Sequence, residues 1–237
     1  MSKTLVCVNV LDNVSSQVYG SHCQEWFRLG RSTNDEFILF HPNRLSIDSA
    51  RNQAAAFAMR FSCDYLYFVD DDVILSPNTY TNLKRCDADI AQALTFIRGY
   101  PFHCMAFKKL DNNTIDYYDD YYEHINKDGT VDCEAVGFSC ALIKVSILNR
   151  INSPYFVTGA QCTEDLYFCI KLRQKLGSDV RIVVDTKVPT SHLLQPEGIS
   201  VDNLQKMKRF YQLENNSEDD RGKEYLEKCK AQFQIVS

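Results

Sequence analysis

The chain has 237 residues and a mass of 27.3 kDa, and 45% of its residues are hydrophobic and 24% charged. This size and balance fit one large globular domain, or one domain with a small appendage, and they exclude collagen-like, coiled-coil and wholly disordered chains. The formal net charge of −5 gives no strong general signal for binding nucleic acid.

The N-terminal part of the chain alternates between predicted strands and predicted helices. Apolar, β-branched runs indicate buried strands, and apolar residues spaced by three or four indicate helices. Strands are expected at 4–11, 36–40 and 64–69, and helices at 21–29 and 48–61. This alternation predicts an α/β fold with a mixed, mainly parallel sheet flanked by helices.

The remainder of the chain is more varied. Further elements are expected as a helix from just after Pro77 to about Arg85, a strand at 89–96, a helix at 163–176 and a strand at 179–185. Residues 102–136 contain an NKDG turn and predict an antiparallel hairpin insertion. We expect one domain at 1–198 and a charge-rich, helical C-terminal extension at 199–237.

The ten cysteines do not indicate a disulfide framework, because no pair has CxxC spacing. Five lie within apolar runs and are expected to be reduced, buried thiols: Cys7, Cys63, Cys104, Cys140 and Cys169. The apolar N-terminal run is too short for a membrane span or a signal peptide. We therefore expect a cytoplasmic protein with no transmembrane segment.

Three consecutive acids, Asp70, Asp71 and Asp72, follow the hydrophobic strand at 64–69. Open α/β sheets bind ligands at the carboxyl ends of their strands. Alternation along an extended backbone places Asp70 and Asp72 on the same side, where Mg²⁺ or Mn²⁺ would offset their repulsion. The structural alternative is a solvated turn or a helix cap.

Two later features have both a structural and a functional interpretation. Glu164 and Asp165 open the helix at 163–176, where acids commonly serve the helix dipole. His192 follows the strand at 179–185, as a metal ligand or as a hydrogen-bonded loop histidine.

The order of these features resembles the core of GT-A-fold glycosyltransferases, especially the family-2 type. The matching stretches are FVDDDV, AVGFSCALIK, TEDLYFCIKLRQKLG and the later SHL. They correspond to the family's DXD motif, glycine-containing segment, xED motif and C-terminal histidine. SIDSARNQAAAFAMRFSCDYLYFVDDD also resembles the family's Arg- and Asn-bearing helix before the DXD strand, so that the resemblance spans about residues 4–194.

The resemblance implies roles for individual residues. Asp70, Asp72 and His192 would hold Mn²⁺ or Mg²⁺ against the diphosphate of the donor, with Asp70 near the ribose or a metal-bound water. Asp165 would be the general base of an inverting reaction, with Glu164 as a second base or acceptor-binding candidate.

Other positions are implied to contact the nucleotide sugar: Asp12 at the base, Arg51 at the diphosphate, Asp71 beside the other acids, and the backbone at Gly137 along the sugar and acceptor pocket. For Arg51 the alternative is a solvated charge on an amphipathic helix.

Together these features predict a metal-dependent glycosyltransferase of the hexosyltransferase type. It would move a sugar from a nucleoside diphosphate donor, UDP by preference, to the hydroxyl of a glycan, lipid-linked, protein or modified-nucleobase acceptor. A nucleotidyltransferase on a related fold is the alternative, although DNVSSQVYG after the first strand lacks the expected Gly-rich, basic phosphate loop. A non-catalytic module that binds a nucleotide sugar or a glycan is the third hypothesis.

Overall fold

A computed structural model describes residues 1–10, 13–42, 45–109, 114–159, 162–194, 197–199, 204, 205 and 208. Its helices are α1 (Ser16–Ser32), α2 (Ile47–Arg60), α3 (Thr79–Arg85) and α4 (Glu164–Leu176), with 3-10 turns η1 (Tyr121–His124), η2 (Val145–Arg150) and η3 (Gly177–Asp179). Its strands are β1 (Lys3–Asn9), β2 (Glu36–Phe40), β3 (Tyr65–Asp70), β4 (Val73–Ile74), β5 (Ile90–Leu94), β6 (Ala106–Lys109), β7 (Ile115–Tyr117), β8 (Thr130–Asp132), β9 (Ala135–Val136), β10 (Cys140–Lys144), β11 (Ile182–Pro189), β12 (Ser191–Leu194) and β13 (Glu197–Ile199).

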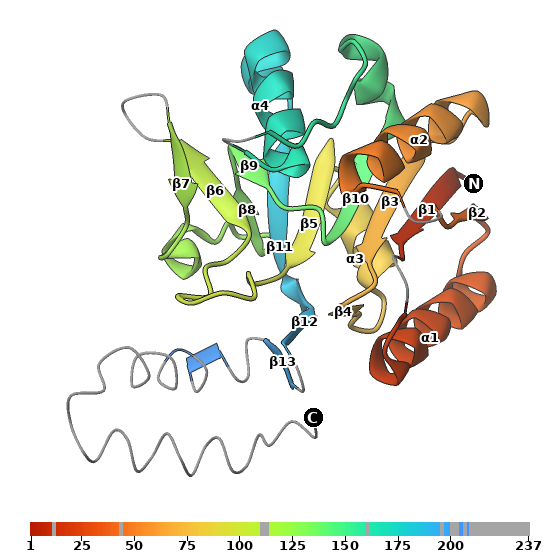
Figure 1. The fold of residues 1–237 in the computed structure, drawn as a ribbon, viewed down its shortest axis with the longest axis horizontal. Coiled ribbons are helices and arrows are strands. Elements are labelled where there is room, and N and C mark those ends of the chain that lie inside the picture. The colour runs from red at the N-terminus through yellow and green to blue at the C-terminus, as the bar shows by residue number, and fades with distance from the viewer. Residues whose placement is uncertain are drawn as a thin grey trace.

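A seven-stranded sheet forms the centre of the molecule, in the order β2-β1-β3-β10-β5-β11-β8 (Figure 1). β2, β1 and β3 are parallel, β10 is antiparallel to both β3 and β5, and β11 is parallel to β5. β8 closes the far edge antiparallel to β11. The carboxyl ends of β1, β3, β5 and β11 therefore lie along the same edge of the sheet, where α/β proteins bind ligands.

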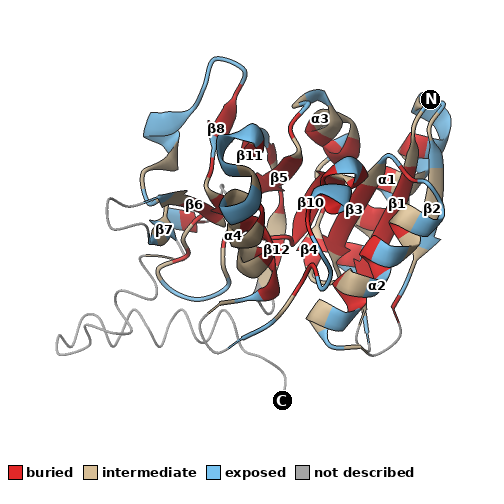
Figure 2. Ribbon diagram, turned by 90° about the horizontal axis from the view of Figure 1, so that it is seen from above, coloured by how far each residue is buried: buried red, intermediate tan, exposed pale blue. Residues whose placement is uncertain are grey.

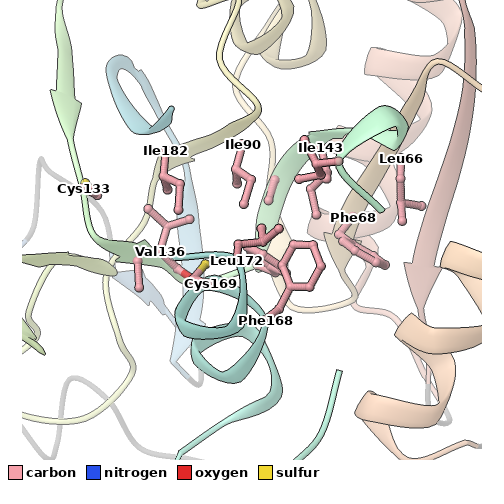
Figure 3. Packing of buried hydrophobic residues seen from close by; sticks show 14 of the residues in the cluster. Leu66, Phe68, Ile90, Cys133, Val136, Ile143, Phe168, Cys169, Leu172 and Ile182 are labelled. Atoms are coloured by element: carbon pink, nitrogen blue, oxygen red, sulfur yellow. The ribbon is translucent and has the colours of Figure 1, made fainter. Parts of the chain in front are cut away.

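Helices cover both faces of this sheet. α2 and α4 pack on one face, where Ala54, Phe68, Phe168 and Leu172 belong to the larger buried cluster. Figure 3 shows Phe168 and Leu172 of α4 beside strand residues of that cluster. α1 and α3 pack on the other face through residues such as Leu29 and Leu83. The strands between the helices are buried, as Figure 2 shows from above, and this double coverage explains their near-continuous apolar sequences.

Two small antiparallel sheets complete the fold. One of them has the strand order β7-β6-β9, and its strands β6 and β7 form the predicted hairpin. The insertion also supplies β8, which joins the central sheet instead of the hairpin. The other small sheet has the order β13-β12-β4 and was not predicted, because β4 has only two residues.

The predicted fold class is confirmed: a mixed, mainly parallel sheet is flanked by helices and carries an antiparallel hairpin. The helix expected at 21–29 is longer, from Ser16 to Ser32, because Ser15 caps it and polar His22 and Glu25 occupy its buried face. Sequence periodicity counts such residues as exposed.

The five cysteines expected to be buried thiols are buried and free. None of the helices in the described part of the chain is long and apolar enough to cross a membrane. The predicted extension at 199–237 lies almost wholly outside the described residues and stays a prediction, as does its division from residues 1–198.

Candidate active site at the carboxyl edge of the sheet

A pocket opens at the carboxyl ends of β1 and β3. Asn9, the last residue of β1, pairs in register with Asp70, the last residue of β3. The three consecutive acids and Asn9 form the polar lining of the pocket. Its apolar lining comes from Val10 after β1, from Pro42 and Leu45 between β2 and α2, and from Ile47 and Ala50 of α2. It thus joins a carboxylate wall to an apolar wall.

The backbone turns within the acidic triplet. β3 ends at Asp70, and Asp71 and Asp72 form a turn that leads into β4. The predicted alternation between Asp70 and Asp72 therefore does not apply, since it requires an extended strand. The turn directs Asp70 toward α2 and Asp72 toward β12, and the two side chains have different partners.

Arg51 connects Asp70 to the start of α4. One guanidinium nitrogen of Arg51 lies 3.4 Å from Asp70 and 3.3 Å from the carbonyl of Phe138, and the other lies 3.0 Å from Glu164. The side chain is 2% exposed and lies over the rings of Phe68 and Phe138. Nη1 and Nε form no hydrogen bond of good geometry with any described residue, so that Nη1 and Glu164 are joined by charge rather than by alignment.

The pKa directions around Arg51 follow from burial and charge. Burial raises the pKa of Asp70, and Arg51 offsets only part of that rise. Burial likewise raises the pKa of Glu164 against the opposing effect of Arg51. Burial alone would lower the pKa of Arg51, but the carboxylates of Asp70, Glu164 and Asp165 outweigh it and raise the pKa. Arg51 therefore stays charged and acts on the site through the acids it holds, not by facing open space.

Asp72 lies between His192 and Arg98. Its Oδ1 atom is 3.3 Å from Nε2 of His192, and its Oδ2 atom is 2.8 Å from Arg98. β12 brings His192 to this position by pairing His192 with Val73 of β4. Burial would raise the pKa of Asp72, but His192 and Arg98 together lower it. Burial would lower the pKa of His192, but Asp72 and the Phe96 carbonyl together raise it.

The hydrogen bond from His192 to Phe96 bears on the metal hypothesis. A carbonyl oxygen only accepts, so Nδ1 of His192 carries a hydrogen and donates it to Phe96 at 2.9 Å. The neutral ring then presents the Nε2 lone pair to Asp72 Oδ1, a buried oxygen that accepts no hydrogen bond from the described chain. Two lone pairs that face each other fit a cation or a proton between them, and a ring N–H held by a carbonyl is typical of metal-bound histidine.

The predicted metal trio is gathered only in part. Within the described residues, no three His, Cys, Asp or Glu side chains are grouped closely enough to hold a metal ion. Asp72 and His192 are paired, whereas Asp70 faces Arg51 and, at 3.5 Å, the amide of Asn9. The residues present fit a divalent cation that takes an oxygen and an imidazole nitrogen from the protein and its other ligands from a bound substrate or water.

The N-terminus of α4 supplies two buried acids. Glu164 and Asp165 are 5% and 7% exposed. Oδ1 of Asp165 accepts hydrogen bonds from the hydroxyl of Thr163 and, at 2.8 Å, from the backbone N–H of Leu166. The first turn of the helix also favours negative charge. Asp165 is thus held as an oriented carboxylate, and no described residue forms an ion pair with it.

Two other predicted positions differ in how they are placed. Asp71 lines the pocket beside Asp70 and Asp72. Gly137 is buried, and a Cβ there would lie 2.1 Å from the side chain of Met105, so that the missing side chain makes room for Met105. The contact predicted between Gly137 and a sugar stays a prediction, and Asp12 lies outside the described residues.

The sequence reasoning missed two residues that the structure places at the site. Asn9 lines the pocket, and its amide reaches Asp70. Its position at the carboxyl end of the first strand could have identified Asn9 as a candidate site residue. Arg98 contacts Asp72, but it stands alone after β5 and has no motif around it.

No family model matches the chain, and a search of curated proteins finds no match. Solved structures of similar fold include A197 from STIV, with 17% identity and a TM-score of 0.59 over 84% of this chain and 91% of that one. The catalytic domain of Drosophila β1,4-galactosyltransferase 7 in complex with xylobiose has 15% identity and a TM-score of 0.45 over 88% and 80% of the two chains. UTP-bound UGPase from Acinetobacter baumannii has 9% identity and a TM-score of 0.46 over 92% and 95%. At these identities the likeness to A197 concerns the fold alone.

Proposed function

We propose that this protein is a glycosyltransferase that uses a divalent cation to move a sugar from a nucleoside diphosphate donor, UDP by preference, to an acceptor hydroxyl. The proposal is carried by one observation: acidic side chains and a histidine from distant parts of the chain lie close together. Arg51 joins Asp70 at the end of β3 to Glu164 at the start of α4. Asp72, two residues after Asp70, pairs with His192 of β12 and with Arg98, so that these groups meet at one edge of the sheet.

The pocket supports a nucleotide as donor. Its apolar wall, which includes Val10 and Leu45, suits the face of a planar base, and its polar wall offers Asn9 and Asp70 to hydroxyl and amide groups. Asp70 is held by Arg51 and Asn9, so its carboxylate is positioned before a ribose arrives. Positioning in advance lowers the entropic cost of binding.

Asp72 and His192 would hold the cation. When bound, a divalent cation supplies Lewis-acid stabilisation of a departing nucleoside diphosphate. The residues contribute the conditions for this: the Phe96 carbonyl accepts from Nδ1 of His192, so that Nε2 faces Asp72, and Arg98 favours the ionised form of Asp72.

Asp165 is the better candidate for the general base. Glu164 forms an ion pair with Arg51 at 3.0 Å, so its carboxylate already has a partner inside the protein. Asp165 is oriented by Thr163 and by the N–H of Leu166. A positioned carboxylate that removes the proton from an acceptor hydroxyl favours attack on the anomeric carbon opposite the leaving group, and hence inversion.

The proposal is tested by incubating the purified protein with a panel of nucleotide sugars and Mn²⁺ and by measuring the nucleotide product. The donor is first chosen by thermal shift, because a ligand that binds only the native state raises its stability. We expect release of nucleoside diphosphate, loss of activity in EDTA, and loss by at least about 10²-fold in Asp72→Asn. Asp179→Asn, an exposed acid at the other end of α4, is the matched control.

Three results would contradict the proposal. Release of pyrophosphate would assign a nucleotidyltransferase instead. Turnover that is unchanged in EDTA and in Asp72→Asn would remove the cation from the mechanism. Tight donor binding without transfer or hydrolysis would favour a binding module.

A further inference from the structure

Arg98 places a positive charge at the position where the proposed cation would bind. Nη1 of Arg98 lies 2.8 Å from Oδ2 of Asp72, and the opposite oxygen of the same carboxylate faces His192. A carboxylate with one oxygen held by Arg98 offers a divalent ion only the other oxygen, which lies beside His192. A cation beside Asp72 would also be repelled by the guanidinium.

The backbone around Arg98 is held by hydrogen bonds, whereas its side chain is more than half exposed. Thr95 and Thr190 share a hydroxyl hydrogen bond at 2.6 Å, the Phe96 carbonyl accepts from His192, and Ile97 donates its N–H to the His103 carbonyl at 3.0 Å. The Arg98 side chain is 55% exposed. A long arginine side chain on a fixed segment can therefore exchange one anion for another without a change in the fold.

A diphosphate is the stronger partner for this guanidinium. Phosphate oxygens match the planar, forked donors of arginine and carry more charge than one carboxylate. The pocket that we propose for the nucleotide is lined by the same Asp72 that Arg98 holds, so a diphosphate extending from it would lie within reach of the side chain.

We infer that Arg98 is a diphosphate-binding residue that occupies Asp72 in the free protein and leaves it for the donor, which opens Asp72 to the divalent cation. This inference rests on the proposed function. It gives a definite consequence: Arg98 opposes binding of the cation alone and favours binding of the diphosphate alone.

The test measures these two equilibria separately in Arg98→Gln. Binding of Mn²⁺ without nucleotide is followed by the electron paramagnetic resonance signal of the free ion. Binding of UDP in EDTA is followed by calorimetry. Removing Arg98 is expected to tighten Mn²⁺ binding about five- to tenfold and to weaken UDP binding about tenfold, because it removes one partly exposed ion pair in each case. Arg98→Lys, which keeps the charge but not the fork, should give smaller shifts.

Opposite shifts distinguish this role from a structural one, because damage to the fold would weaken both ligands. Arg60→Gln removes the same charge from the far end of α2 and should change neither affinity. Adding Asp72→Asn to Arg98→Gln should abolish the gained Mn²⁺ affinity, which locates the ion.

Unchanged affinities, or shifts in the same direction, would overturn the inference, and so would a failure of Arg98→Gln to bind Mn²⁺. The proposed function is judged by release of nucleoside diphosphate from a nucleotide sugar, so the two can fail independently.

Discussion

Adjacent acids at the start of α4 have different electrostatic surroundings. Glu164 is neutralised by Arg51 at 3.0 Å, whereas Asp165 accepts hydrogen bonds from Thr163 and from the N–H of Leu166. Burial also raises the pKa of Glu164. Glu164 therefore belongs to an internal ion pair, whereas Asp165 has an oriented carboxylate, which suits the role of base proposed for it.

The two acids should respond differently to loss of charge. Asp165→Asn removes the proposed base and should lower the single-turnover rate by about 10²–10⁴-fold. Glu164→Gln acts only through Arg51 and should lower it less. Both are compared by rapid quench with saturating donor, and Asp179→Asn serves as control. A rate for Asp165→Asn within about threefold of the wild type would contradict the assignment, since a base contributes far more than that.

At this scale the sequence predicted which residues gather, but not how they pair. Asp70, Asp72, Glu164 and His192 were all selected from motifs, and all lie at one edge of the sheet. Their pairing depends on a turn at the end of β3 that the string of acids does not reveal. The partner Arg98 could not be found, because contact across 26 positions leaves no local pattern.

At the scale of elements, α1 shows how a polar face can hold a helix in place. Nε2 of His22 in α1 donates a hydrogen bond to the Val73 carbonyl at 2.9 Å, and the hydroxyl of Ser21 accepts one from the N–H of Leu75 at 3.1 Å. Glu25, which is 1% exposed, accepts from the N–H groups of Asn78 and Tyr80. α1 therefore positions the segment that runs from β4 to α3, directly after the acidic triplet.

His22 should make stability depend on pH. Burial, aided by nearby His41 and opposed by the Val73 carbonyl, lowers the pKa of His22 below its ordinary value of 6.5. The unfolded chain therefore binds a proton more readily, and the free energy of unfolding should fall as pH drops below about 6.5, with a slope of at most about 1.4 kcal/mol per pH unit. Urea unfolding between pH 5 and 7.5 measures this.

The comparison for His22 is the variant His22→Gln, which keeps a donor for Val73 and has no proton to bind. Its stability curve should be flatter than the wild-type curve across this range, although other groups contribute equally to both. If stability fell equally with pH in the two proteins, His22 would not be the source of the pH dependence.

Elements with uniform patterns were predicted best. β2 has the predicted bounds, and α2 begins and ends within one residue of its prediction at 48–61. α1 was underestimated because its buried face is polar, and β4 and β12 were missed because pairing between short strands depends on long-range contacts. β11 continues past its predicted end through an irregularity between Asp185 and Pro189.

For the whole molecule, Arg51 joins parts of the chain that are far apart in sequence. It extends from α2 to Asp70 at the end of β3, to the carbonyl of Phe138 before β10, and to Glu164 at the start of α4. α2 and α4 cover the same face of the sheet, and Arg51 lies between their N-terminal halves among buried aromatic rings. The side chain thus belongs both to the core and to the candidate site.

Replacing Arg51 should cost the protein much of its stability. Arg51→Met keeps an apolar stem but leaves the buried carboxylate of Glu164 and the partly buried carboxylate of Asp70 without their cation. Removing the partner of a buried charge typically costs about 3–5 kcal/mol. The measurement is the free energy of unfolding in urea, with a check that the slope is unchanged. Arg51→Met combined with Glu164→Gln removes one of the stranded charges and should recover part of the loss.

The double variant separates charge from packing. If Arg51 stabilised the fold only by contact with Phe68 and Phe138, Arg51→Met would be mild and Glu164→Gln would add its own cost without any recovery. Recovery in the double variant means that the two residues are coupled, as expected for a direct ion pair at 3.0 Å. In that case the acids that shape the site are held in the core by one guanidinium, and the position of the site cannot be separated from the stability of the domain.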